Sequence, residues 1–139
     1  MSNEKSKKEA ARWITTAEDD LDSARVLQKN RKFAHACFHA QQAGEKAVKA
    51  LWYSKDMDPW GHSIAKLIEE LATAYSEGHS RLKPLYRKAL VLDRFYIPTR
   101  YPNGLPDITP DMAFTDEDAV LCIRNAEEII ERVRAQLEI

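Results

Sequence analysis

The most continuous apolar surface in the chain is predicted for residues 33–53, FAHACFHAQQAGEKAVKALWY. This stretch is rich in alanine and free of proline, which favours a helix throughout. On a helical wheel its polar side chains form one narrow stripe, made of His35, His39, Gln42, Lys46, Lys49 and Tyr53. A helix that is apolar over most of its circumference is usually contacted on several sides, so we predict a central helix. Gln41 and Glu45, one turn apart, interrupt its apolar arc.

Apolar residues recur at helical spacing in four further stretches of the chain. They predict helices over about residues 8–29, 62–76, 82–96 and 115–137, separated by turns at 30–32 and 76–80 and a loop at 54–61. Thr115 and Asp118 have the spacing of a capping box at the start of the last helix. The pattern predicts an all-α fold, an antiparallel up-and-down bundle of about five helices in a single domain over residues 1–139.

A long proline-rich segment, residues 97–114, precedes the last predicted helix and holds four of the six prolines. Connections in helical bundles are usually about 2–8 residues long, and longer ones are often functional. The segment also carries apolar side chains, at Ile97, Tyr101, Leu105, Ile108, Met112 and Phe114. We therefore expect it to pack over the bundle.

Charge and composition restrict the possible partners of the protein and its cellular compartment. The formal net charge of −1 gives no global attraction to nucleic acid or to an anionic membrane. No apolar run approaches the roughly 18 residues of a membrane span, and the first residues lack the apolar core of a signal peptide. We expect a cytoplasmic protein without a membrane partner. Because that compartment is reducing, Cys37 and Cys122 are interpreted as two buried thiols.

Several predicted helices carry apolar residues on two faces, which is more apolar surface than one small bundle should expose. We therefore predict a homodimer with twofold symmetry, the commonest closed arrangement.

Three runs, AxxCFHAQQAGEKAVKALW, GHSIAKLIEEL and LDRFYIPTRYPNGLP, resemble the HEPN domain family (higher eukaryotes and prokaryotes nucleotide-binding), including sacsin-like HEPN modules. The resemblance covers nearly the whole chain. It implies a helical bundle that is usually a homodimer. Prokaryotic members are often paired with a minimal nucleotidyltransferase as a toxin–antitoxin system. Many members are metal-independent ribonucleases, and others are described as nucleotide binders.

The ribonuclease signature of that family is an arginine followed, after four to six residues, by a histidine. In this chain Arg94 is followed by Thr99 at the expected histidine position, with Tyr101 two residues beyond. A threonine hydroxyl titrates far from neutrality and is a poor acid or base. We therefore assign no catalytic residue from the sequence.

The candidate residues for binding a nucleotide or an RNA phosphate are Arg94, Arg100, Tyr101, Gln41 and Glu45. The fork of an arginine suits phosphate, and we expect Arg100 to fold back towards Arg94. Gln41 and Glu45 would offset the two arginines when no ligand is bound, or would serve as a purely structural pair. Arg87 and Lys88 extend the expected basic cluster.

Other polar residues receive structural interpretations. His35 and His39 have a spacing that can chelate zinc, but no third ligand accompanies them, so we expect neither metal nor cofactor. Lys46 and Lys49 are expected to be solvated. His62 and Ser63 are interpreted as the start of a helix.

Three hypotheses follow from the sequence. The first is a non-catalytic or weakly catalytic dimer that binds nucleotide or RNA phosphate and pairs with a minimal nucleotidyltransferase. The second is an endoribonuclease toxin with a degenerate site around Arg94 and Arg100. The third is a structural dimerisation module whose arginines are tied up by Glu45.

Overall fold

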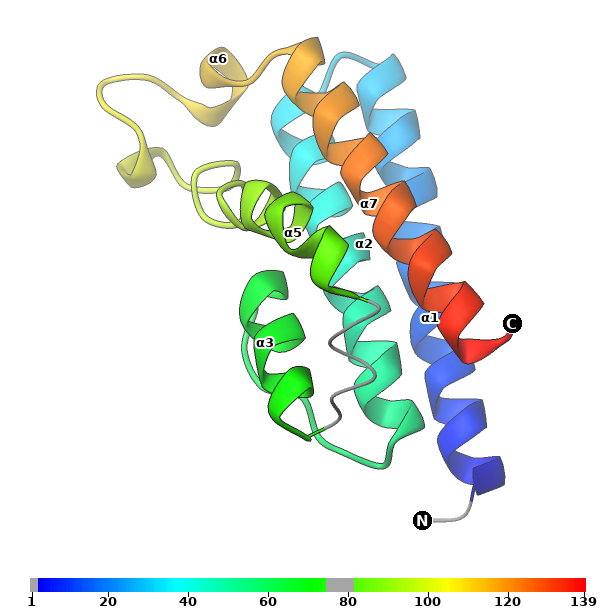
Figure 1. Cartoon of the computed structure of the whole chain (residues 1–139). Coiled ribbons are helices and arrows are strands. Elements are labelled where there is room, and N and C mark those ends of the chain that lie inside the picture. Colours follow the sequence, from blue (N-terminus) through cyan, green and yellow to red (C-terminus); the bar gives the residue numbers. More distant parts are fainter. Residues whose placement is uncertain (1–2, 75–81) are drawn as a thin grey trace.

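Three long helices form the body of the molecule. The computed structural model describes residues 3–74 and 82–139, and within these ranges it contains helices and no strand. Helices α1 (Asn3–Lys29), α2 (Phe33–Ser54) and α7 (Asp116–Leu137) run side by side along the molecule (Figure 1). The all-α bundle expected from the sequence is confirmed.

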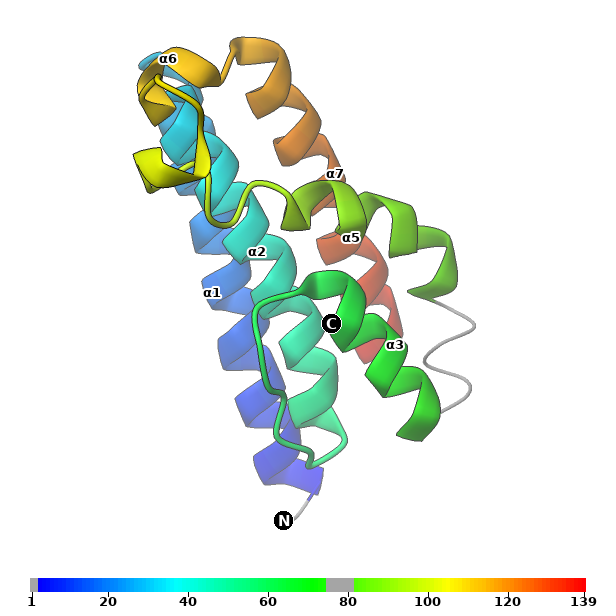
Figure 2. The same cartoon turned by 90° about the vertical axis from the view of Figure 1, so that its left-hand side faces the viewer.

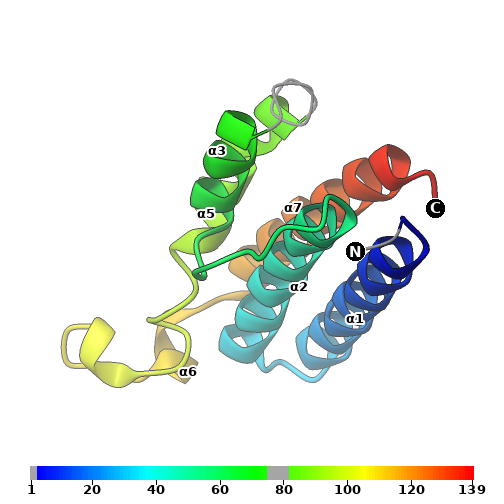
Figure 3. The same cartoon turned by 90° about the horizontal axis from the view of Figure 1, so that it is seen from below.

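Shorter elements complete the bundle. Helices α3 (Ile64–Ala74) and α5 (Tyr86–Asp93) lie on the side of α2 that faces away from α1 (Figure 3). A 3-10 turn, η1 (Lys83–Leu85), leads into α5. Between α5 and α7 the chain contains only two short elements, η2 (Pro102–Gly104) and α6 (Pro110–Ala113).

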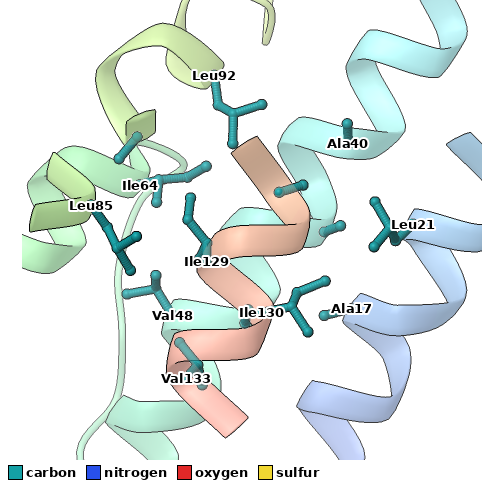
Figure 4. Packing of buried hydrophobic residues seen from close by; sticks show 14 of the residues in the cluster. Ala17, Leu21, Ala40, Val48, Ile64, Leu85, Leu92, Ile129, Ile130 and Val133 are labelled. Carbon is teal, nitrogen blue, oxygen red and sulfur yellow. The ribbon is translucent and has the colours of Figure 1, made fainter. Parts of the chain in front are cut away.

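Helix α2 is the central element, as its apolar circumference predicts. It contacts α1, α3, α5, α6 and α7. Its buried alanines allow close approach, since Ala40, Ala43 and Ala47 are fully buried. Figure 4 shows side chains from several helices pointing into a shared interior, among them Ala17, Leu21, Ala40, Val48, Ile64, Leu92, Ile129, Ile130 and Val133.

The predicted boundaries agree with the structure at α2 and α7. The capping box is present, because Thr115 Oγ1 accepts a hydrogen bond from the Asp118 amide while the Asp118 carboxylate accepts one from the Thr115 amide. Helix α1 starts at Asn3, earlier than predicted, and its first turns include the buried Ser6.

The other two helices differ more from their predictions. Helix α3 starts at Ile64, while its predicted end and the turn at 76–80 lie outside the described residues. The helix expected over 82–96 ends at Asp93. The amides of Arg94 and Phe95 bond to the carbonyls of Val91 and Leu92, three residues back, which tightens the last turn into 3-10 geometry.

The proline-rich segment does not cover the bundle as expected. Figure 2 shows it beside the first half of α2, and Figure 1 shows it projecting to one side of the bundle. Most of its apolar side chains are exposed, with Ile97 at 47%, Tyr101 at 49% and Met112 at 68%. Leu105 and Phe114 are half-buried, and Phe114 packs against Phe95 with a ring separation of 5.7 Å. The segment lacks a helical period, so its apolar residues share no face that could be buried together.

The two cysteines are buried and free, in agreement with their interpretation as thiols. Cys37 lies on α2 and Cys122 on α7. A hydrogen bond between the two thiols raises the pKa of Cys122, and burial raises it further. They therefore behave as small apolar residues at the α2–α7 contact.

The close packing around Gly44 generates a stability prediction. A Cβ built at this position would lie 3.0 Å from Ile64 Cδ1 and 3.2 Å from Leu92 Cδ1. Gly44→Leu should therefore lower the free energy of unfolding by about 1–3 kcal/mol or more through overpacking. Thermal unfolding followed by circular dichroism measures the effect.

Gly44→Ala is the matched control. The added methyl group meets only the ends of flexible side chains. Alanine also favours the helix by about 1 kcal/mol over glycine. The melting temperature of Gly44→Ala should therefore stay near that of the wild type. Equal melting temperatures for the leucine and alanine variants would show that this face of α2 is open.

Candidate phosphate-binding site

Arg100 is the best-placed cation in the proline-rich segment. Its guanidinium carbon lies 4.6 Å from the ring centre of Phe38, 4.4 Å from that of Tyr96 and 5.0 Å from that of Tyr101. Its Nε donates a 3.0 Å hydrogen bond to the Tyr96 carbonyl. These contacts fix the position of the guanidinium and leave its two terminal nitrogens available to a ligand.

A pocket of about 250 Å³ adjoins this guanidinium. Its lining residues come from the start of α2 and from the segment that leads into α6: Lys32, Ala34, His35, Thr99, Arg100, Thr109, Pro110 and Asp111. Two cations, Arg100 and Lys32, and the positive end of the α2 dipole favour an anion here, while Asp111 reduces the net charge. The half-exposed Tyr101 ring lies beside the guanidinium and offers a surface on which a base can stack.

Arg94 lies in different surroundings. It is exposed at the end of α5 and lines an open groove of about 820 Å³ with Tyr86, Arg87, Leu90 and Val91. Lys88 forms an ion pair with Glu128 at 3.1 Å. The basic cluster expected from the sequence is therefore divided, and only Arg100 contributes to the pocket beside α2.

Glu45 does not pair with either arginine, which corrects the expectation from the sequence. Its carboxylate is buried and lies 2.9 Å from Lys49 Nζ and 3.3 Å from His62 Nδ1. Gln42 Nε2 donates a further bond at 3.3 Å. A buried charge needs such partners, and α2 with its neighbouring loop supplies all of them.

The two lysines of α2 are less solvated than expected. Only 12% of the Lys49 side chain is exposed, because Lys49 pairs with Glu45. Lys46 forms an ion pair of 2.6 Å with Asp20 of α1. Lys46 therefore joins α2 to α1, Lys49 pairs within α2, and neither is an open cation.

His62 is the partner of Glu45 that the sequence did not identify. It follows Gly61, whose φ of +93° is a left-handed conformation that glycine adopts readily. Gln41 Nε2 donates a 3.0 Å bond to the His62 carbonyl, so α2 holds the backbone of the loop as well as the ring. The ring stacks on Tyr96 with centres 4.9 Å apart, and 59% of the side chain is exposed.

The loop that carries His62 is also fixed from α5. The Asp93 carboxylate accepts hydrogen bonds from the amides of Ile64 and Ala65, at 2.8 and 3.1 Å, and from Ser63 Oγ at 2.8 Å. This caps the first turn of α3 from another helix. Ser63 thus has the helix-start role predicted for it. The cap also brings the end of α5, and with it Tyr96, against His62.

Thr99 and His39 were considered in the sequence analysis but were not assigned to the site. Thr99 is buried, and its hydroxyl donates to the Phe95 carbonyl. His39 is half-buried, and desolvation lowers its pKa although Asp20 opposes the shift. Across the described residues, no three His, Cys, Asp or Glu side chains cluster as a metal site would require. The described helices are too short or too polar to span a lipid bilayer.

Sequence reasoning missed His62, Phe38 and Tyr96 for one reason. Their importance depends on contacts between α2, the loop before α3 and the end of α5, which no local spacing reveals. The available signal was the buried Glu45, which needed a partner from another element.

Known proteins resemble this chain along most of its length. Putative toxin MJ1304 of Methanocaldococcus jannaschii is 29% identical over 132 residues, which cover 91% of this chain and 87% of that protein. The crystal structure of TT1696 from Thermus thermophilus is 32% identical with a TM-score of 0.82, covering 91% of this chain and 97% of the other.

Two further solved structures support the same assignment. ST0689, described as an archaeal HEPN homologue, is 33% identical with a TM-score of 0.74, covering 92% of this chain and 97% of the other. An HEPN domain protein from Thermotoga maritima is 28% identical with a TM-score of 0.70, and the match covers 91% of this chain and 98% of the other. The model of the HEPN domain matches residues 10–136. The chain therefore belongs to the HEPN domain family.

Proposed function

We propose that this HEPN protein binds the phosphate of a nucleotide or an RNA in the pocket beside Arg100. The observation that carries the proposal is the guanidinium held over three aromatic rings, with its terminal nitrogens uncommitted. Lys32 adds a second cation to the pocket, and Tyr101 adds an exposed ring. Guanidinium for phosphate and an aromatic surface for a base are the two recognition elements of a single-stranded nucleic acid or a nucleotide.

The cellular role that we propose is a toxin–antitoxin-type system in which the protein pairs with a minimal nucleotidyltransferase. The support is the family and the name of the relative from Methanocaldococcus jannaschii, a putative toxin. In this proposal Gln41 and Glu45 act behind the site, since both hold His62 and neither lines the pocket.

The binding experiment compares Arg100→Ala with Arg12→Ala. Arg12 is an exposed guanidinium on the first half of α1, at the opposite end of the bundle from α6 (Figure 1). Both variants lose one positive charge, so a global electrostatic effect would weaken both equally. Titration with nucleotides and with a short single-stranded RNA measures the dissociation constants, and thermal melts verify that each variant is folded.

Arg100→Ala should weaken binding about 10- to 100-fold, because hydrogen bonds to charged groups contribute roughly 1.5–3 kcal/mol. Arg12→Ala should bind like the wild type, and added salt should weaken wild-type binding. If wild type and Arg100→Ala bind equally well, the ligand lies elsewhere and Arg100 is structural.

We also propose that the protein is a homodimer through the outer face of α5. The groove along this helix is lined by Leu90, Val91 and Tyr86, and Leu90 is 44% exposed. Arg87 and Arg94 border the same groove. An open apolar surface with a charged border is the usual anatomy of a protein–protein contact.

Leu90→Glu should convert the dimer to a monomer, because it buries an unpaired carboxylate at the contact. Light scattering at micromolar concentration measures the mass, and Val26→Glu on α1, another exposed apolar position at 58% exposure, is the control that should stay dimeric. A wild-type protein with a monomeric mass would contradict the proposal.

A further inference from the structure

Two basic side chains in the pocket beside Arg100 have no partner within the protein. Lys32 and His35 both line the pocket, and neither side chain forms a hydrogen bond or an ion pair with another described residue. Lys32 immediately precedes the first turn of α2, and His35 lies within that turn. Together with Arg100, they bring three nitrogen-bearing side chains to one cavity of about 250 Å³.

The other polar side chains of the pocket are committed or acidic. The Thr99 hydroxyl donates to the Phe95 carbonyl, and the Thr109 side chain caps α6 by accepting a hydrogen bond from the Met112 amide. Among the described residues that line the pocket, Asp111 is the one acid. No side chain caps the start of α2, and its first turn contains no acidic residue. The pocket therefore presents cationic donors to a ligand, with one carboxylate opposing them.

The net charge of the pocket depends on the proton of His35. Arg100 and Lys32 each carry a positive charge, and the charge of Asp111 offsets one of them. One positive charge remains when His35 is neutral, and protonation of His35 adds a second. A phosphodiester is a monoanion, whereas a phosphate monoester is largely a dianion at neutral pH. A dianion therefore matches the pocket in which His35 is protonated.

The number of donors and the size of the cavity also favour a terminal phosphate. A monoester has three oxygens without a substituent, and a diester has two. The two terminal nitrogens of Arg100, the ammonium of Lys32 and the imidazole of His35 supply donors for three oxygens. The cavity, at about 250 Å³, is smaller than the roughly 300–1,000 Å³ of sites that enclose a whole small molecule. It suits a phosphate group with a single ester substituent that leads out to solvent.

We propose that this pocket takes a terminal phosphate, the dianionic monoester of a nucleotide or of an RNA end, and that His35 binds it in the protonated form. The inference rests on the proposed phosphate binding and adds the class of ligand. Lys32 and His35 are then binding residues together with Arg100. Because the bound dianion stabilises the imidazolium, binding takes up a proton from solution.

Charged groups face His35 from each element at the pocket. A proton on His35 is repelled by Lys32 before α2, by His39 one turn further along α2 and by Arg100. It is attracted by Asp111 of α6, and a bound dianion adds to that attraction. Of these residue types only histidine changes its charge between about pH 5 and 8. His39 is therefore the group that a control must separate from His35.

The first experiment compares two ligands that share one base, adenosine 5′-monophosphate and its methyl ester. The ester is a diester, with one unsubstituted oxygen and one negative charge fewer. At about pH 7.5 the wild type should bind the monophosphate about 10-fold more tightly than the ester, the usual contribution of one hydrogen bond between charged groups. Short RNAs with a 5′-phosphate, with a 3′-phosphate and with neither show whether the ligand is a nucleotide or an RNA end.

Lys32→Gln should reduce the preference for the monophosphate. Lys29→Gln is the matched control, since Lys29 is an exposed lysine in the last turn of α1 and does not line the pocket. Both variants lose one positive charge, so a general electrostatic effect would change both preferences equally. Thermal melts verify that each variant is folded.

The second experiment counts protons. Calorimetric titration with adenosine 5′-monophosphate at about pH 7.5, in two buffers of different ionisation enthalpy, measures the protons taken up on binding. The wild type should take up a proton, His35→Gln should lose this uptake, and His39→Gln should retain it. Glutamine at position 35 keeps a donor but cannot titrate, so a merely structural role of His35 would leave the proton uptake of the variant unchanged.

The possible failures are distinguishable. Equal affinities of the wild type for the monophosphate and its methyl ester, or the same proton uptake by the wild type and His35→Gln, overturn this inference and leave phosphate binding at Arg100 intact. If neither nucleotide nor RNA binds, the proposed function and this inference both fail.

Discussion

The burial of one carboxylate, that of Glu45, determines how the site is built. Removing a charge from water is costly unless partners replace the lost hydration. Lys49 and Gln42 supply two of them from α2 itself, and the third is His62 from the following loop. The central helix therefore holds the loop before α3 through a charge, whereas its contacts with α1 and α7 are mainly apolar, with the Lys46–Asp20 ion pair added on the side of α1.

A second carboxylate, that of Asp93, fixes the other half of the arrangement. By capping α3 it joins the start of that helix to the end of α5. The turns that follow place Tyr96 against His62 and Arg100 against Tyr96. The positions of Arg100, Tyr96 and His62 therefore depend on two carboxylates, those of Glu45 and Asp93. Each carboxylate bonds to a group on another element.

The features that the sequence predicted correctly depend on residues that are close together in the chain. The apolar arc of α2, the capping box at Thr115 and the close approach at Gly44 all depend on residues within a few turns, and the structure confirms them. The partners of Glu45 and the exposure of Ile97 and Tyr101 were predicted wrongly. Both depend on which distant elements meet, and the apolar residues of the proline-rich segment have no period that reveals their direction. Arg100 was identified from the sequence because a guanidinium is a suitable group for binding phosphate. The arrangement of the three aromatic rings around it was not identified.

The most direct test of this account is a crystal structure of the protein with a dinucleotide RNA. The account predicts that the phosphate contacts the terminal nitrogens of Arg100 and that a base lies on the ring of Tyr101, with Glu45 still in contact with His62 Nδ1. A phosphate bound in the Arg94 groove and not at Arg100 would contradict it.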